Sequence, residues 1–448
     1  MSVFSETIKG ARGSNEMDAK ESLNDFLQLS TDNVNDTSER RRENRGYYLN
    51  VFEKEMLRSS DAAAHVKENI FSDWREIARS LSKGEMAIEF VEYTPVGTLD
   101  NEDYLGALYI TRDKHPHIIR LCKVSDVDTL KMNFTVNGLH KIYDILWHPI
   151  LSGNTPITKL WFSPSMHLFH INIEAALPDS IVAYRVSSTR NVLKNNDTPD
   201  LSEIVLFGGL NYDNRDTISG DVISNHTALN IIRSIDTDDE RIGLSYLKGT
   251  LTEVVSANEI LSHTNSNIKL YVDKYGTEER FKNLSGMAIS LLHVATHGFY
   301  IKNCDDVSNI GTRVMRKSGL FMSGAKSIWK GEKENYFGDD GILLSEEIEV
   351  LDFNKLNLVI LSACGTGLGN PTNDGVYGLQ RAFKKAGAQT IIMSLWNVDD
   401  NATALMMETF YKELVKTNSK HQAFRKAQKA VQDIYEDPIY WASFIMLD

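Results

Sequence analysis

Apolar segments alternate with amphipathic stretches over the second half of the chain. Short apolar runs predict strands at Glu203–Leu210, Ile289–Ala295, Leu358–Ala363, Thr390–Trp396 and Phe444–Leu447. Helical spacing of apolar residues predicts helices at Thr250–Leu261, Val376–Ala386, Ala402–Val415 and Gln422–Ile434. Strands that alternate with helices indicate a mainly parallel sheet covered on both faces, so this half is predicted to be an α/β three-layer αβα sandwich.

The first half follows a different pattern. Residues 1–80 are polar at first and then show apolar residues at helical spacing, which predicts a flexible and helical leader. Residues 81–195 predict one helix, Leu139–Leu151, and short strands at Met86–Tyr93, Leu105–Thr111, Ile118–Cys122, Ile157–Phe162, Leu168–Ile173 and Ile181–Val186. The polar stretch Asn191–Leu201 predicts a linker. We therefore expect three parts: the leader, a lobe over 81–195 and an α/β domain over 196–448.

Composition disfavours several kinds of partner and site. The 448-residue chain has a net charge of -13, whereas contacts with nucleic acid need clustered Lys and Arg. The three cysteines, Cys122, Cys304 and Cys364, form neither a disulfide framework nor a CxxC pair, so we expect a reducing compartment and no metal or cofactor. The N-terminus lacks a signal-peptide core, and no run approaches the ~20 apolar residues of a membrane span. These features predict a cytoplasmic protein that binds neither nucleic acid nor membrane.

Two predicted strands end in turns that carry reactive side chains. One ends in Ala295-Thr296-His297-Gly298, and the other ends in Ser362-Ala363-Cys364-Gly365. Reactive groups of open α/β sheets lie just past the C-terminal ends of the strands. If these two strands are neighbours, His297 and Cys364 face one another at one edge of the sheet.

Such a pair suits nucleophilic catalysis. The attacking species of a cysteine is its thiolate, and a nearby His raises the thiolate fraction or takes the proton during attack. The oxyanion of the intermediate needs hydrogen-bond donors, for which the backbone N–H groups of Gly298 and Cys364 are the natural candidates.

Other interpretations of these residues stay open. Cys364 alone is compatible with a small buried apolar residue, and His297 alone with a hydrogen-bonded core histidine. His293 and His297 have HxxxH spacing, but the context is a strand without the Glu of a zinc motif, so we expect no metal there. The glycines after Cys364 depart from a dinucleotide fingerprint in spacing.

At these residues the sequence resembles the CHAT family, caspase-like peptidases related to caspases and separases. The resemblance runs from about Trp74 to the C-terminus, and its segments are LLHVATHGFY, SGLFMSGA, DGILLSEEIEVLDF, LVILSACGTGLG, DGVYGLQRAFKKAGAQTIIMSLWNVDDNAT and PIYWASFIML. The family's catalytic His falls on His297 and its Cys on Cys364. The family often has Glu after the Cys, where this chain has Gly365.

The resemblance implies a caspase-like fold that is preceded by a degenerate lobe. It also implies an endopeptidase that cleaves a partner protein through a thioester intermediate and is controlled by a regulatory protein. The alternative is a catalytically silent module for interaction or signalling. The long polar segment Ile301–Asp340 is typical of a lid or binding loop. We expect low basal activity, relieved by a partner or by release of this loop.

Substrate selection is the last expectation. The segment Leu395–Asp400 is similar to a separase loop in which the matching Asp binds a basic P1 side chain, and that position falls on Asp400. Asp374, in the loop after Cys364, is a second candidate for the substrate cleft. Alternatively, Asp399, Asp400 or Asn401 caps the following helix.

Overall fold

The computed structural model divides into two compact units, Met1–Ile77 and Ala78–Asp448. It describes residues 73–95, 102–112, 114–131, 134–153, 156–194, 196–213, 244–300, 315, 318–329, 339–363, 370–372, 375–396 and 399–448. The fold below is that of the second unit. The predicted leader over 1–80 lies almost entirely outside the described residues, apart from helix α5 (Trp74–Ser80).

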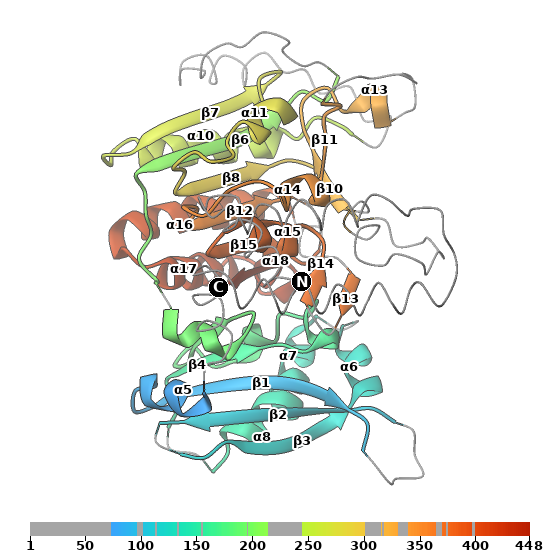
Figure 1. Cartoon of the computed structure of the whole chain (residues 1–448), viewed down its shortest axis with the longest axis vertical. Helices are drawn as coiled ribbons and strands as arrows, with labels where there is room; N and C mark the ends of the chain where they lie inside the picture. Colours follow the sequence, from blue (N-terminus) through green and yellow to red (C-terminus); the bar gives the residue numbers. More distant parts are fainter. Residues whose placement is uncertain are drawn as a thin grey trace, which may run out of the picture. The chain divides into compact units, whose positions relative to one another are not determined.

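One sheet of eleven strands runs through Ala78–Asp448 (Figure 1). Its strands are β1 (Glu85–Tyr93), β2 (Tyr104–Thr111), β3 (His117–Lys123), β4 (Lys159–Ser163), β5 (Val182–Arg185), β6 (Glu203–Leu210), β7 (Asn267–Asp273), β8 (Leu291–Ala295), β12 (Leu358–Ser362), β15 (Thr390–Ser394) and β16 (Phe444–Leu447). Their order across the sheet is β3-β2-β1-β4-β5-β16-β15-β12-β8-β6-β7. A second sheet consists of β9 (Gly298–Tyr300), β10 (Ser318–Phe321) and β11 (Ile342–Leu344). A third consists of β13 (Asn370–Thr372) and β14 (Gly375–Tyr377).

Most neighbouring strands of the large sheet are parallel. The antiparallel pairs are β3 with β2, β2 with β1 and β16 with β15. Since β16 is parallel to β5 but antiparallel to β15, strands β1, β3, β4, β5 and β16 run opposite to β2 and to the strands from β15 to β7. The prediction of an α/β fold with a mainly parallel sheet is confirmed.

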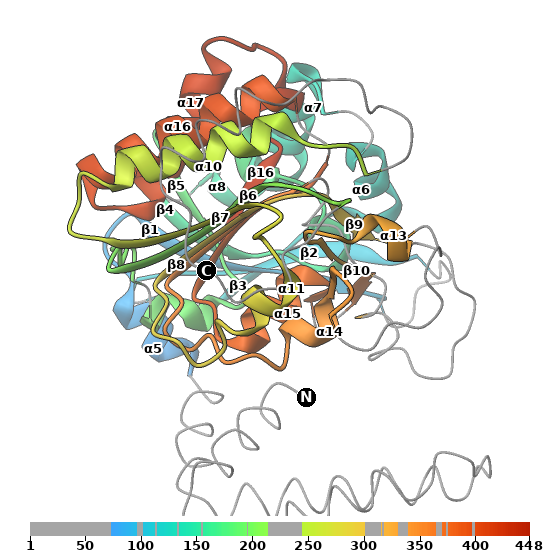
Figure 2. The same cartoon turned by 90° about the horizontal axis from the view of Figure 1, so that it is seen from above.

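Helices cover both faces of the catalytic half of the sheet. Helices α10 (Lys248–Leu261), α16 (Asp400–Thr417) and α17 (Lys420–Gln432) lie on one face, and α11 (Glu278–Lys282), α14 (Ser345–Ile348) and α15 (Leu379–Ala386) lie on the other (Figure 2). Successive residues of a strand point to opposite faces and so belong to different cores. Leu206 of β6 packs in the core with the first set of helices, and Phe207 packs in the core with the second. The predicted three layers are therefore present.

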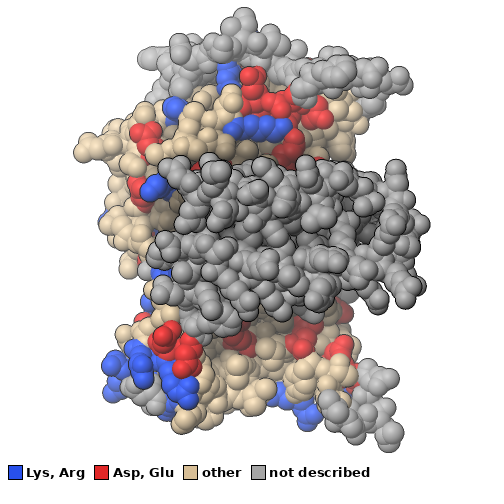
Figure 3. All heavy atoms as spheres, in the orientation of Figure 1, with Lys and Arg blue, Asp and Glu red and all other residues tan. Residues whose placement is uncertain are grey.

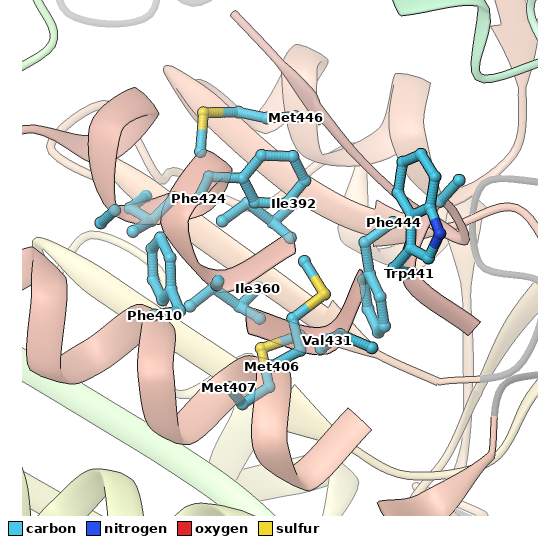
Figure 4. Packing of buried hydrophobic residues seen from close by; sticks show 14 of the residues in the cluster. Ile360, Ile392, Met406, Met407, Phe410, Phe424, Val431, Trp441, Phe444 and Met446 are labelled. Carbon is cyan, nitrogen blue, oxygen red and sulfur yellow. The ribbon is translucent and has the colours of Figure 1, made fainter. Parts of the chain in front are cut away.

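The first of these cores continues into the other half of the molecule. Apolar residues of β1, β2 and β4 belong to the same cluster as those of α10, α16 and α17. Figure 4 shows its centre, where Met406 and Phe410 of α16 and Phe424 of α17 pack against Ile360 of β12 and Phe444 of β16. The smaller helical elements are α6 (Val124–Lys131), α7 (Val136–Ile142), the π-helix η1 (Tyr143–Trp147), α8 (His148–Leu151), η2 (Met166–Leu168), η3 (Ile173–Ala176), η4 (Thr189–Lys194), α13 (Lys326–Trp329) and α18 (Pro438–Trp441).

Two predictions of secondary structure were wrong. Leu168–Ile173 is not a strand but a connection between η2 and η3. Asn172 explains the difference, because its side chain accepts from the N–H of Ala175 and donates to two distant carbonyls, which fixes a turn. The helix expected from Val376 begins at Leu379, after Gly378, because residues 375–377 pair with β13.

The segment Ile301–Asp340 is not one uninterrupted loop. It contains β10 and α13, while residues 301–314, 316–317 and 330–338 lie outside the described residues. Met315, Leu320 and Phe321 are buried, and the Trp329 ring lies 4.9 Å from that of Phe321. Within the described ranges, no helix combines the length and apolarity needed to cross a bilayer.

Candidate active site

The two turns singled out from sequence follow neighbouring strands. Strand β8 pairs in parallel with β12, and Ala295 lies opposite Ser362. His297 comes two residues after Ala295, and Cys364 comes two residues after Ser362. Adjacent strands are about 4.8 Å apart, so both strands deliver their turns to the same edge. Cys364 itself lies outside the described residues, as does Asp374 between β13 and β14.

Backbone and side-chain contacts fix His297 on two sides. Its ring Nε2 lies 2.8 Å from the carbonyl oxygen of Ser245. Its backbone N–H donates to the Tyr212 hydroxyl at 3.3 Å. The Tyr212 and His297 rings are 5.2 Å apart. The Tyr212 hydroxyl also lies 2.9 Å from Oγ1 of Thr296, whose hydroxyl donates to the Phe321 carbonyl at 2.6 Å. The imidazole is therefore held in one orientation.

The contact with Ser245 sets the tautomer of His297. A carbonyl oxygen only accepts, so Nε2 carries the proton and Nδ1 has the free lone pair when the ring is neutral. Burial lowers the pKa of His297, and the Ser245 carbonyl and the charge of Asp400 partly oppose that shift. A neutral imidazole with an available Nδ1 is the form that can act as a base.

Gly298 begins β9, directly after the histidine. It lies opposite Leu320 of β10, and the N–H of Phe321 donates to the His297 carbonyl at 2.9 Å. Hydrogen-bonded and non-hydrogen-bonded pairs alternate along an antiparallel ladder, so Gly298 occupies a non-hydrogen-bonded position. Its N–H is consequently directed away from β10.

A small cavity of about 50 Å³ lies beside these strand ends. The C-terminal ends of β8, β12 and β15 meet the first turns of α10 and α16 there. The lining consists of Leu247, Gly249, Thr250, Glu253, Thr296, Ser362, Ala363, Ser394, Asp400, Thr403 and Phe444. Apart from its few apolar members, this lining is made of hydroxyl groups and two carboxylates. The cavity therefore has the chemistry to receive a polar or cationic side chain.

Asp400 and the helix cap are separate residues. The Asp399 side chain accepts from the N–H groups of Asn401 and Ala402 at 3.0 Å each, so Asp399 caps α16. Asp400 is exposed and lines the cavity. Its side chain packs against the first turn of α10, 3.3 Å from the place where a Cβ on Gly249 would lie.

Sequence patterns did not point to several residues of this site. Ser245 and Tyr212 lie in connections after β6, and no motif marks them. Glu253 had one signal that could have found it: it is an acid among the apolar residues of α10 that face the sheet. Its carboxylate accepts from Ser362 Oγ at 3.0 Å and lies 2.9 Å from Nε2 of the buried His293.

Neither a metal cluster nor a second reactive thiol accompanies the site in the described part of the chain. No group of three or more His, Cys, Asp or Glu in those residues is placed to hold a metal ion. Burial and the nearby charge of Asp126 raise the pKa of Cys122 to about 11, which keeps that thiol protonated. Cys304 lies outside the described residues.

Surface charge is mixed on the visible face. Basic and acidic side chains lie side by side in both the upper and the lower part of Figure 3, among the residues it describes. Lys282, for example, contacts Glu278, Asp339 and Glu347 together. The described part of this face therefore carries no continuous basic patch.

Comparison with known proteins gives a family match. The model of the CHAT domain matches residues 137–448. The chain is also similar to tetratricopeptide repeat protein 28, with 34% identity over 108 residues in Homo sapiens and 32% over 108 residues in Mus musculus. The match covers 23% of this chain and only 4% of each of those relatives.

Some solved structures align with large parts of this chain. The separase–securin complex of Saccharomyces cerevisiae aligns with a TM-score of 0.48 and 10% identity, over 86% of this chain and 31% of that chain. The Arg-specific cysteine proteinase gingipain R aligns with a TM-score of 0.38 and 11% identity, over 70% and 67% of the two chains.

Proposed function

This chain belongs to the CHAT domain family, and we propose that it is a cysteine endopeptidase of the caspase and separase type, with Cys364 as nucleophile and His297 as general base. The register of β8 and β12 carries the proposal, because it brings the two turns to the same sheet edge. The contact of Nε2 with the Ser245 carbonyl, which leaves the lone pair of the neutral ring on Nδ1, supports the role of His297 as a base.

The proposed reaction has two steps. The Cys364 thiol gives its proton to Nδ1 of His297, and the thiolate adds to the scissile carbonyl carbon of a peptide. The tetrahedral intermediate collapses when the C–N bond breaks, and the leaving amine takes the proton from His297. Water, deprotonated by His297, then hydrolyses the thioester and releases the new carboxylate.

Backbone donors stabilise the oxyanion in this scheme. The N–H of Gly298 is directed away from β10 and is available to an oxygen in the site. The N–H of Cys364 is the proposed second donor. Burial of His297 supports the base role, since it keeps the imidazole neutral near neutral pH.

Substitution of each member of the dyad tests this proposal. We expect Cys364→Ala and His297→Ala each to abolish cleavage of a peptide library and labelling by a thiol-reactive activity probe, with little change in melting temperature. Cys122→Ser is the matched control and should keep full activity, because the Cys122 thiol stays protonated. Near wild-type cleavage in either dyad variant contradicts the assignment.

The alternative is a CHAT module that keeps the fold without turnover. It would bind partners, and the same experiment identifies it: the wild-type chain would then label and cleave no faster than Cys364→Ala. The fixed tautomer of His297 favours the enzyme, because a binding module does not need a base with a free Nδ1.

We also propose the class of substrate and partner. Asp400, at the rim of the cavity, would pair with an Arg or Lys at P1, with Asp374 as a second contact on the substrate. A regulatory protein partner fits the relatives, which are repeat proteins by name. A cytoplasmic location fits the three sparse cysteines, which form no disulfide framework.

A further inference from the structure

A connected set of buried polar side chains lies directly beneath the proposed site. Glu253 is 5% exposed, and His293 and Tyr411 are fully buried. Ser362 Oγ donates to Glu253 Oε2 at 3.0 Å, Glu253 Oε1 lies 2.9 Å from His293 Nε2, and His293 Nδ1 lies 2.8 Å from the Tyr411 hydroxyl. The set therefore links α16, β8 and α10 to the last residue of β12.

The contact between Glu253 and His293 is a close approach of two polar atoms rather than a well-directed hydrogen bond. Their geometry does not satisfy a hydrogen bond, and neither atom has another hydrogen-bond partner among the described residues. The directed bond of Glu253 is the one to Ser362. This difference makes Ser362 the group that Glu253 fixes most tightly.

The end of β12 is held from three sides. Besides the Glu253 contact, the N–H of Thr296 donates to the Ser362 carbonyl at 3.2 Å, and Ser394 Oγ donates to the Ala363 carbonyl at 2.7 Å. Ser362 and Ala363 are the two residues that precede Cys364. The contacts that hold Ser362 and Ala363 in place therefore also set the position from which the chain enters the turn at Cys364.

A buried carboxylate at this position calls for an explanation beyond packing. Thr250 and Ala257 lie one turn before and one turn after it on the same helix face, and the other apolar residues of α10 that are buried include Leu251 and Val254. Burying a carboxylate is unfavourable unless its partners compensate, and apolar residues of similar size often stabilise a core better. The acid instead occurs where α10 passes the end of β12.

We propose that Glu253 is a positioning residue that acts on Cys364 through Ser362. The carboxylate fixes the Ser362 hydroxyl, and thereby the direction in which the chain leaves β12. His293, whose Nδ1 is in hydrogen-bond contact with Tyr411, lies against the other oxygen of the carboxylate. The expected effect on catalysis rests on the proposed function, whereas the hydrogen bond between Glu253 and Ser362 does not.

A double-mutant cycle tests the route of action. We expect Glu253→Gln and Ser362→Ala each to lower kcat by about tenfold, while KM changes by less than about twofold. Because both act through one hydrogen bond, the double variant should be no slower than the slower single variant. Multiplied effects in the double variant, or an unchanged kcat in both single variants, would overturn the proposal.

A readout without turnover separates this inference from the proposed function. The rate of Cys364 carboxamidomethylation by iodoacetamide at pH 7, followed by peptide mass spectrometry, should fall in both single variants and no further in the double variant. If the wild-type chain cleaves nothing, the proposed function fails, and this second cycle still decides the role of Glu253. Independent effects on the alkylation rate would overturn it.

Controls keep a loss of folding apart from a loss of position. Glu259, exposed on the same helix, is the matched site, and Glu259→Gln should leave kcat and alkylation unchanged. Melting temperatures are measured for all variants. If Glu253→Gln does not fold, Glu253→Asp takes its place in the cycle, because it keeps the charge and shortens the reach to Ser362.

Discussion

At the scale of single residues, the protonation of His297 gives the most direct test. The base must be neutral, and burial holds the pKa of His297 below the ordinary value of 6.5. We therefore expect the acid limb of the pH profile of kcat/KM to have its midpoint below 6.5. The charge of Asp400 raises the pKa of His297, so Asp400→Asn should move this limb to still lower pH.

This pH prediction is checked with an uncharged peptide substrate, so that a change in P1 binding does not enter the profile. An acid limb above 6.5 in the wild type, or a shift to higher pH in Asp400→Asn, contradicts it.

Two adjacent acids allow a matched comparison of specificity and stability. Asp399 caps α16, so Asp399→Ala should cost about 1 kcal/mol of unfolding free energy and leave the P1 preference unchanged. Asp400 lines the cavity without capping the helix, so Asp400→Ala should change stability little and lower kcat/KM for an Arg or Lys at P1 at least tenfold.

Melting temperatures and P1 profiles of these two variants decide the role of Asp400. A wild-type preference for an apolar P1 residue rules out the ion pair. A loss of stability in Asp400→Ala as large as that in Asp399→Ala would make Asp400 a second structural residue of the helix end.

Some residues of the site had a sequence signal and others had none. His297 and Gly298 follow an apolar strand, and a reactive residue just past a strand end is a recognisable pattern. Ser245 contributes only a backbone carbonyl, and any residue has one. Such a contact depends on the path of the chain, which no side-chain pattern encodes.

At the scale of elements, the joint between β6 and α10 controls the position of the site. Gly209 has a positive φ of 57°, and a Cβ there would lie 2.5 Å from that of Leu251. Thr250 Oγ1 also accepts from the Gly209 N–H at 2.9 Å. The first turns of α10 thus rest directly on the glycine, and these turns carry both Glu253 and Gly249.

Gly209→Ala should therefore shift α10 and impair both folding and activity. We expect a loss of more than about 2 kcal/mol of unfolding free energy, since steric overlap adds to the strain of an L-residue at positive φ. Gly286→Ala is the matched control, because Gly286 has a φ of 77° but open space around its Cβ position. It should cost about 1 kcal/mol and leave kcat unchanged.

Urea unfolding and peptide cleavage measure both glycine variants. Equal losses of stability in the two would show that backbone strain alone matters, and that contact with α10 does not.

Strands of the large sheet were predictable from their apolar runs, and those of the small three-stranded sheet were not. Strand β16 begins and ends where its apolar run does, and β8, β12 and β15 differ from expectation by one or two residues at an end. Strands β9, β10 and β11 were not expected, because each forms by pairing with a partner that is distant in the sequence. A local apolar pattern does not encode such pairing.

At the scale of the whole molecule, the boundary expected near residue 195 does not interrupt the sheet or the core. Strand β5 pairs with β16, and one apolar cluster contains residues from β1 to α17. A composition shift marks a change of local pattern, but it does not show whether two segments share a hydrophobic core. The division into a first lobe and a catalytic domain stays a prediction about ancestry and function rather than about packing.

Asn172 offers the sharpest test of whether these two parts unfold together. Its side chain is fully buried, and its Nδ2 donates to the carbonyls of Ala442 and Phe444 at 2.8 and 3.2 Å. Removing it takes this donor from the Ala442 carbonyl, while the Phe444 carbonyl keeps the Nε2 of Gln428 as a donor, so Asn172→Ala should cost about 2 kcal/mol. Asn191→Ala, which removes a less buried contact to the Asp448 carbonyl, should cost less than about 1 kcal/mol.

Hydrogen exchange followed by mass spectrometry reports both parts of the sheet at once. Because the core is shared, Asn172→Ala should lower the protection of peptides from β1 and β4 and of peptides from β12 and β16 by the same free energy. Loss of protection confined to β1 and β4 would mean that the first part opens alone. The continuous sheet would then join two units of separate stability, and partner binding to the first part could proceed without disturbing the strands that carry His297 and Cys364.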